Sequence, residues 1–264
     1  MLDVLRTLLG RKRPVAATFE ARARLAAAEW PAVVYAIGDI HGCLDELLWL
    51  EDMLVKDARD VEGERWIITL GDHIDRGPRS AQVIEHLTGA PPPGFRRISL
   101  AGNHEQLLLD FLAEPAANFQ WLEFGGIETA RSYGLRDAAL SFGGRNARGI
   151  ARELASLIPD AHLDFLRKLP ISLSLPGFHF VHAGLRPGLA MEEQTDEDLL
   201  WIREPFLDEI GSPAEIVVHG HTPTALPEIK PWRIGVDTGA FASGRLTAVR
   251  LRQGAAPVFM ATGT

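Results

Sequence analysis

Side chains that commonly bind divalent metals follow five short apolar runs in this sequence. VVYAI leads into GDIHG, WIITL into GDHIDRG, and RRISL into AGNHE. Two later runs end in FVHAG and VHGHT. Each segment places a carboxylate, an imidazole or an amide directly after an apolar stretch, and the candidate ligands are Asp39, His41, Asp72, Asn103, His182 and His221.

The mixture of ligand types indicates the class of metal. Carboxylate, imidazole and amide oxygen together suit borderline ions such as Mn, Fe or Zn, whereas Ca and Mg sites carry more oxygen and less imidazole. Six ligands exceed the needs of one open site. A carboxylate shared by two ions about 3.5 to 4 Å apart, the usual spacing in two-metal hydrolases, accounts for the surplus. We therefore expect two divalent ions, with Mn as the first choice and Fe or Zn as alternatives.

Three more side chains beside these ligands suit phosphate chemistry. Asp75 and Arg76 follow Asp72 by three and four residues. The guanidinium of Arg76 offers a planar fork that matches two phosphate oxygens. His104 stands next to Asn103 in the sequence and is free to act as a proton donor.

The first three apolar runs each begin a unit of strand, polar loop and helix. The pattern predicts strands over 33–37, 66–70 and 96–100 and helices over 43–58, 80–87 and 106–114. Three such units in succession predict a parallel sheet covered by helices, with the polar loops at the carboxyl ends of the strands. At the end of the first strand, an extended backbone would direct the side chains of Asp39 and His41 to one side.

The rest of the chain adds an insertion and a second sheet. Residues 113–170 mix helical stretches with glycine turns and predict a helical and loop insertion. After it, ISLSL, a PG turn and FHFVHAG indicate a hairpin, and EIVVHGH, RIGVDTGA and GRLTAVRLR extend a mostly antiparallel or mixed sheet. Ala-rich residues 17–30 predict a short helix lying on a larger body. We expect an N-terminal extension over 1–30 and a single catalytic domain over 31–264.

Composition excludes several classes of protein. With 264 residues, 46% of them hydrophobic and 23% charged, the chain is typical of a globular domain. It lacks the roughly 20-residue apolar run of a membrane-spanning helix, so we expect no membrane partner. Its 27 Lys and Arg against 35 Asp and Glu argue against a nucleic-acid duplex as partner. The single cysteine, Cys43, excludes an internal disulfide and is expected to be a packed residue. The basic cluster follows the apolar start instead of preceding it, which favours a cytoplasmic protein over a secreted one.

Taken in order, the motifs GDIHG, GDHIDRG, GNHE, HAG and GHT closely resemble the phosphoprotein phosphatase branch of the metallophosphoesterases. This branch includes protein Ser/Thr phosphatases and symmetrical diadenosine tetraphosphatases, and the resemblance runs from about residue 34 to residue 240. It implies an α/β fold, a four-layer α/β/β/α sandwich with two mixed sheets, and two metal ions that serve the hydrolysis of phosphate esters.

The resemblance also implies roles for individual residues. Asp39, His41 and Asp72 resemble the ligands of the first metal. The ligands of the second metal are matched by Asp72, Asn103, His182 and His221. His104 looks like the acid and Asp75 like its orienting partner, while Arg76 and Arg203, the latter in LLWIREPF, look like phosphate clamps. His219, two residues before His221, is then a structural histidine.

Some positions depart from the commonest family pattern. HAG replaces the commoner HGG, so Ala183 adds one methyl group near the site. Pro223 follows GHT where nucleases and phosphodiesterases of the wider superfamily carry a second histidine, which favours the phosphoprotein phosphatase branch. The segment WLEFGG with a later Thr and SYG, over 121–134, is similar to one that lines the substrate entrance in bacterial members.

These features predict a metal-dependent phosphoester hydrolase. The leading hypothesis is a serine/threonine protein phosphatase that works by in-line attack of a metal-bridging hydroxide, with a phosphorylated protein or a small phosphate ester as substrate. The alternative is a symmetrical bis(5'-nucleosyl)-tetraphosphatase, which would share these residues and differ in the walls of its pocket. A catalytically silent binding module would be expected to have lost a ligand, and none is missing. The sequence carries no signal for the oligomeric state.

Overall fold

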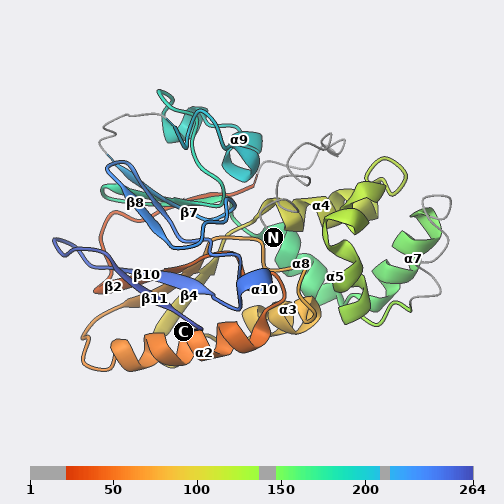
Figure 1. The fold of residues 1–264 in the computed structure, drawn as a ribbon, viewed down its shortest axis with the longest axis horizontal. Coiled ribbons are helices and arrows are strands. Elements are labelled where there is room, and N and C mark those ends of the chain that lie inside the picture. The colour runs from red at the N-terminus through yellow and green to blue at the C-terminus, as the bar shows by residue number, and fades with distance from the viewer. Residues whose placement is uncertain (1–21, 137–146, 209–214, 264) are drawn as a thin grey trace.

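The computed structural model describes residues 22–136, 147–208 and 215–263, and its strands form two sheets (Figure 1). The five-stranded sheet has the order β11-β10-β2-β3-β4, with β2 (Val33–Ile37), β3 (Arg65–Thr69), β4 (Phe95–Ser99), β10 (Thr247–Leu251) and β11 (Val258–Ala261). The six-stranded sheet has the order β1-β5-β6-β7-β9-β8, with β1 (Arg24–Ala26), β5 (Ser172–Leu175), β6 (Phe178–Val181), β7 (Ile216–His219), β8 (Glu228–Lys230) and β9 (Arg233–Gly235).

The three predicted strand-loop-helix units are confirmed. β2, β3 and β4 are parallel neighbours and lead into α2 (Leu44–Asp57), α3 (Ser80–Thr88) and α4 (Asn103–Ala113). α4 begins at Asn103 instead of the predicted Gln106, because the Glu105 side chain accepts a hydrogen bond from Gly102 N and closes the first turn. Asn103 and His104 therefore stand at a helix N-terminus and not in a loop.

Alternating side chains of β2 show how the layers pack. Tyr35 and its neighbours two residues away face α2, whereas Val34 and Ala36 join a cluster with Phe180 and Val218 of the other sheet. The two sheets therefore lie face to face. Helices α2 and α9 (Asp196–Trp201) cover their outer faces, at the bottom and top of Figure 1. Two mixed sheets between helices confirm the predicted α/β fold.

The insertion after α4 is helical in its described part. It contains η1 (Phe119–Phe124), α5 (Gly126–Ser132), α7 (Ala147–Leu157) and α8 (Asp160–Lys168), which gather beside α3 and α4 (Figure 1). In the described part of the chain, the remaining short helices are η3 (Met191–Glu193) and α10 (Ala240–Ser243). Within the described ranges, no helix is both long and apolar enough to cross a bilayer.

Two expectations about individual elements are wrong. The run over 244–252 supplies β10, which pairs antiparallel with β2 and so joins the first sheet instead of the second. Arg24–Ala26 form strand β1, parallel to β5, where a helix is predicted. Pairing with the edge of β5 outweighs the helix propensity of this Ala-rich segment. The Arg22 guanidinium holds the start of the segment in place by donating hydrogen bonds to the carbonyls of Leu166 and Leu169. Residues 17–21 of that predicted helix lie outside the described part of the chain.

Candidate metal centre and acid pair

The six predicted ligands converge at the carboxyl ends of strands from both sheets. β2, β3 and β4 lead to the ligands of the first half of the chain, and the parallel strands β6 and β7 lead to the two later histidines. All six side chains are buried, none more than 6% exposed: Asp39, His41, Asp72, Asn103, His182 and His221. Two sheets packed face to face thus bring the carboxyl ends of their strands to one cluster of donor atoms.

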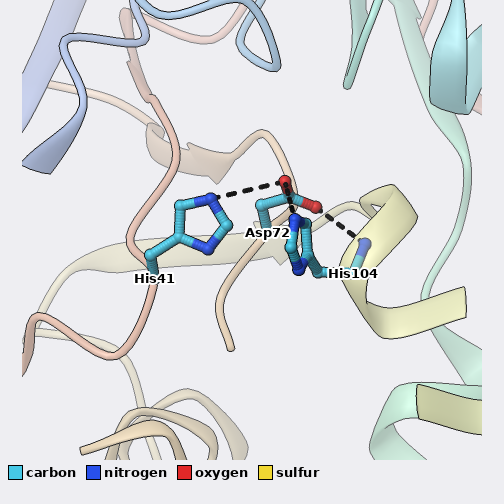
Figure 2. Close-up of side chains that lie close together, drawn as sticks. All are labelled: His41, Asp72 and His104. Carbon is cyan, nitrogen blue, oxygen red and sulfur yellow. Dashed lines mark hydrogen bonds and ion pairs between the residues drawn. The ribbon is translucent and has the colours of Figure 1, made fainter. Parts of the chain in front are cut away.

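Among the described residues, two groups of side chains could hold a cation, and Asp72 belongs to both. His41, Asp72 and His104 form one group and Asp72, His182 and His221 the other, with the donor atoms of each group within 4.8 Å of one another. Figure 2 shows the His41 and His104 rings on either side of the Asp72 carboxylate, with nitrogens 3.5 and 3.8 Å from its Oδ2. The other oxygen, Oδ1, lies 3.4 Å from His182 Nε2. This position fits a carboxylate shared by two ions.

Asn103 belongs to the second group. Its Oδ1 lies 2.8 Å from His182 Nε2 and 2.9 Å from His221 Nδ1. Three uncharged potential ligand atoms, one oxygen and two nitrogens, therefore face one another at these distances. Such an arrangement suits a cation placed among their lone pairs.

The ring orientations of two histidines are fixed from outside the cluster. His41 Nδ1 lies 2.7 Å from the carbonyl of Ile74, and His182 Nδ1 lies 2.9 Å from the carbonyl of Leu70. Since only a protonated nitrogen can donate to a carbonyl, the Nε2 atoms keep their lone pairs toward the cluster. Burial lowers the pKa of His41, His182 and His221, which keeps these imidazoles neutral and able to bind metal.

Asp39 stands at the edge of the cluster. Both of its oxygens lie 3.1 Å from the backbone nitrogen of His221 and accept its hydrogen bond. Burial, then the charges of Asp237 and Asp72, raise the pKa of Asp39 well above its ordinary value. Three carboxylates gathered in a buried place repel one another, and divalent cations would relieve that repulsion. The donor set therefore fits metal ions.

The backbone of the site is strained at the functional residues. Among the described residues, the non-glycine residues with positive φ are His41, Asp72, Asp75, Arg76 and His221, with φ between 45° and 71°. Residues other than glycine rarely adopt this left-handed backbone conformation. Backbone strain of this kind is concentrated at functional sites. The extended backbone expected to run through His41 is therefore wrong at that residue. The chain turns at His41, whose N–H donates to the Asp72 carbonyl.

The predicted acid and its partner are in direct contact. His104 Nδ1 lies 2.7 Å from Asp75 Oδ2, and both side chains are buried. The other nitrogen, Nε2, faces the Arg76 guanidinium at 3.0 Å. A histidine held at Nδ1 by a carboxylate can present Nε2 to a substrate.

Two guanidinium groups lie beside the cluster. Arg76 Nη1 is 2.9 Å from His41 Nε2, and its guanidinium stacks over the Phe241 ring at 4.9 Å. Arg203 Nη2 donates to the carbonyl of His221 at 3.4 Å. Burial, then the charge of Arg76, lower the pKa of Arg203, so the two cations are close enough to repel. Such a pair is suited to an anion that lies between them.

Two carboxylates at the site were missed by the sequence reasoning. Asp237 follows β9 and neighbours Asp39, and burial raises its pKa to about 6. Its signal was the segment GVDTG, where an acidic side chain follows an apolar run. Glu105, the last residue of GNHE, accepts hydrogen bonds from the backbone nitrogens of Gly102, Asp72 and His73 at 2.7, 2.9 and 2.8 Å. His219 is buried outside both groups, with Nδ1 3.0 Å from the Gly220 carbonyl.

Replacing Glu105 with glutamine should destabilise the fold in a pH-dependent way. Burial opposes the charge of Glu105, but His73 and the backbone donors prevail and lower its pKa to about 2 from 4.5. Because the folded pKa is depressed, the stabilisation is complete above pH 4.5 and is lost as the pH falls toward 2. We expect Glu105→Gln to lower the free energy of unfolding by about 2 kcal/mol at pH 7.

Denaturant unfolding of both proteins between pH 7 and pH 3 measures this difference. It should shrink as the pH falls. Glu192→Gln, at an exposed position in η3, serves as the control and should change little. A difference that stays constant across the range would show that the charge of Glu105 contributes nothing.

Comparison with known proteins agrees with this geometry. Residues 32–235 match the family described as calcineurin-like phosphoesterase. The asymmetrical bis(5'-nucleosyl)-tetraphosphatase PrpE of Oceanobacillus iheyensis is 26% identical over 238 residues, which span 81% of this chain and 86% of the relative. Serine/threonine-protein phosphatase 1 of Salmonella typhimurium is 28% identical over 237 residues, which span 87% of this chain and 96% of the relative.

A solved structure shares the fold. The protein serine/threonine phosphatase of Saccharomyces cerevisiae superposes with a TM-score of 0.56 at 14% identity, covering 91% of this chain and 82% of that chain. The family match includes every strand that leads to a candidate ligand, namely β2, β3, β4, β6 and β7, and ends with β9. The chain therefore belongs to the calcineurin-like phosphoesterase family and is a metal-dependent phosphoester hydrolase.

Proposed function

We propose that the chain is a serine/threonine protein phosphatase that uses two divalent ions, with Mn as the preferred metal. The first ion would be held by Asp39, His41 and Asp72, and the second by Asp72, Asn103, His182 and His221. The observation that carries the proposal is the contact of 2.7 Å between His104 and Asp75 beside the shared carboxylate, with the half-buried guanidinium groups of Arg76 and Arg203 next to the cluster. The likeness to the Salmonella typhimurium phosphatase over 96% of that protein's length supports the choice of substrate class.

His104 is proposed as the acid and not as a ligand of the first ion, although its Nε2 faces Asp72 at 3.8 Å. Its Nδ1 is engaged by the buried carboxylate of Asp75, which fixes the ring and leaves Nε2 to face a substrate. Asp39 supplies the negative charge that the first ion needs. For this reason we place Asp39 in the ligand set.

The residues of the chain divide the chemistry among them. Bound divalent ions would lower the pKa of a water molecule toward neutrality and hold phosphate oxygens. Arg76 and Arg203 neutralise the charge that develops on the phosphoryl group. His104 gives its Nε2 proton to the departing oxygen while its Nδ1 proton stays directed at Asp75.

No side-chain nucleophile is required for this reaction. Cys43 is buried beside the site loop, and burial raises the pKa of its thiol to about 12. A protonated, buried thiol is a poor nucleophile. This agrees with its predicted role as a packed residue.

A dinucleoside polyphosphate hydrolase is the second candidate. The observation in its favour is the likeness to the Oceanobacillus iheyensis protein named as a bis(5'-nucleosyl)-tetraphosphatase. The two activities are separated by specificity constants for phosphoserine and phosphothreonine peptides, an aryl phosphate and a dinucleoside tetraphosphate, measured side by side with Mn. We expect the phosphopeptides and the aryl phosphate to be the better substrates.

Removing Arg203 should test how the phosphate is held. A phosphomonoester dianion presents three terminal oxygens, so two guanidinium forks and two ions can all engage it. Arg203→Ala should lower kcat/KM for phosphopeptides and aryl phosphates about 10-fold or more, as expected for one lost charge-assisted contact of about 1.5 to 3 kcal/mol. Arg59→Ala, exposed beyond the end of α2, is the control and should leave kcat/KM unchanged.

One result would overturn the protein phosphatase assignment. That result is a wild-type enzyme that splits dinucleoside tetraphosphate at least about a hundred times more efficiently than any phosphopeptide, a difference of roughly 2.7 kcal/mol in transition-state stabilisation. In the same result, Arg203→Ala leaves the ratio of these two efficiencies unchanged. The second candidate would then take its place.

A further inference from the structure

The Asp75 carboxylate accepts hydrogen bonds from two side chains besides its contact with His104. The indole Nε1 of Trp121 donates to Asp75 Oδ2 at 2.8 Å, and the hydroxyl of Thr129 donates to Oδ1 at 2.6 Å. Asp75 N in turn donates to Thr129 Oγ1 at 2.8 Å and to Ser80 Oγ at 3.0 Å. Trp121 and Thr129 are fully buried. Both oxygens of the carboxylate are therefore engaged before His104 is considered.

These two donors come from the helical insertion and not from a strand-loop-helix unit. Trp121 lies in η1 and Thr129 in α5. The segment between them also contacts the next site residue, because the Gly125 carbonyl accepts from Arg76 N at 3.1 Å. A Cβ at Gly125 would lie 2.6 Å from Arg76 N, so only glycine permits this approach.

Trp121 also connects Asp75 to the helix that carries His104. Its ring packs on Phe111 of α4, with centroids 5.0 Å apart. A Cβ at Gly126 would lie 2.4 Å from the indole, so glycine leaves the space that the ring occupies. The indole is thereby fixed between α4 and α5, with its N–H directed at the carboxylate.

A carboxylate on a left-handed turn needs such support. Asp75 has φ of 71° and Arg76 has φ of 67°, a conformation that the surrounding structure must maintain. A free carboxylate also rotates about its χ angles and could present either oxygen to His104. With Oδ1 bound to Thr129 and Oδ2 to Trp121, the lone pair that remains on Oδ2 is directed at His104 Nδ1.

We propose that Trp121 and Thr129 are positioning residues for proton delivery by His104. They act through Asp75, which they hold so that the imidazole keeps its Nδ1 proton and directs Nε2 toward the leaving oxygen. The step they serve transfers one proton from Nε2 to that oxygen as the phosphorus–oxygen bond breaks. The inference rests on the proposed function, in which His104 is the acid.

The test uses two conservative substitutions that remove only the donor. Trp121→Phe keeps an aromatic ring in the α4–α5 contact and loses the indole N–H. Thr129→Val keeps the shape of the side chain and loses the hydroxyl. Thr129→Ser restores a hydroxyl and is the rescue variant.

Matched controls lose a similar group far from Asp75. Trp30→Phe loses an indole N–H that donates to the Pro176 carbonyl, and Thr262→Val loses a buried hydroxyl that accepts from Leu246 N. Neither residue contacts the site, so both variants should turn over substrate as the wild type does.

The readout is the dependence of kcat on the leaving group, for esters that range from aryl to alkyl phosphates. We expect Trp121→Phe and Thr129→Val to lower kcat about 10-fold for alkyl phosphates, which need protonation, and less than about 3-fold for nitrophenyl phosphate, which does not. KM and the bound metal content should stay unchanged, and Thr129→Ser should recover most of the loss. Equal losses for all esters, or no loss in either variant, would overturn the proposal.

A second readout does not depend on the reaction. The Nδ1 proton of His104 can be followed by NMR in protein with 15N-labelled histidine and assigned with His104→Asn. It should be protected from solvent exchange in the wild type and in the two controls, and exchange at least about 10-fold faster in Trp121→Phe and Thr129→Val, as expected for a weakened hydrogen bond. Unchanged exchange would overturn the positioning role. If the wild type hydrolyses no phosphomonoester, the proposed function fails, and the exchange rates still decide whether these residues hold the pair.

Discussion

Replacement of Asp72 by asparagine should weaken binding of both ions at once. Asp72 is the side chain common to the two candidate groups, and its oxygens face histidines on opposite sides. Asparagine lacks the negative charge and one of the two acceptor oxygens, so the substitution weakens the ligand that the two sites share. We expect kcat to fall by about 10³-fold or more, on the scale of the several kcal/mol that metal ions contribute to such reactions. Chelation of the wild type should abolish activity, and Mn should restore it.

Elemental analysis together with kinetics measures this result. His41→Asn and His182→Asn are the informative comparisons, because each alters one group and should reduce occupancy at one site. Asp72→Asn should reduce it at both. Full activity in protein confirmed to be free of metal would contradict the two-ion proposal.

Replacement of His104 by asparagine should separate proton delivery from metal binding. His104 contacts Asp75 through Nδ1 and is proposed as the acid, so its loss should leave both ions bound. We expect kcat to fall about 10²-fold or more for alkyl phosphate esters, the usual scale for a general acid. The loss should be smaller for aryl phosphates, whose leaving oxygens need little protonation.

The same leaving-group series measures this prediction. Equal losses for aryl and alkyl esters would remove His104 from the role of acid. Loss of one ion in His104→Asn would instead make His104 a ligand, in agreement with its position 3.8 Å from Asp72 Oδ2. Because Trp121 and Thr129 are proposed to act through Asp75, their substitution in the His104→Asn background should have little additional effect on kcat.

The sequence predicted the three parallel strands β2, β3 and β4 and the loops that follow them well because those features are local. Each apolar run ends in a glycine-bearing polar loop, and parallel strands bring such loops to one edge. Spacing alone could not reveal that the backbone turns into the left-handed region at His41. That conformation is maintained by tertiary hydrogen bonds, such as the one from His41 N to the Asp72 carbonyl.

Other features depended on contacts between distant segments. β10 pairs with β2 across more than two hundred residues of sequence, and a strand pattern does not specify its partner. Trp121 was noted in the sequence, but its role requires the contact with Asp75, which lies 46 residues away. Asp237 carried a local signal in GVDTG that was read only as part of a strand.

The candidate metal centre lies across the seam between the two sheets. Asp72 and Asn103 follow strands of one sheet, whereas His182 and His221 follow strands of the other. Neither sheet can assemble the second group alone, so ion binding is coupled to the docking of the sheets on each other. Ions bound there would stabilise the whole molecule by mass action, with a free energy that grows as the logarithm of the ion concentration over the dissociation constant. We therefore expect the free energy of unfolding, as well as the rate of hydrolysis, to rise with the concentration of metal.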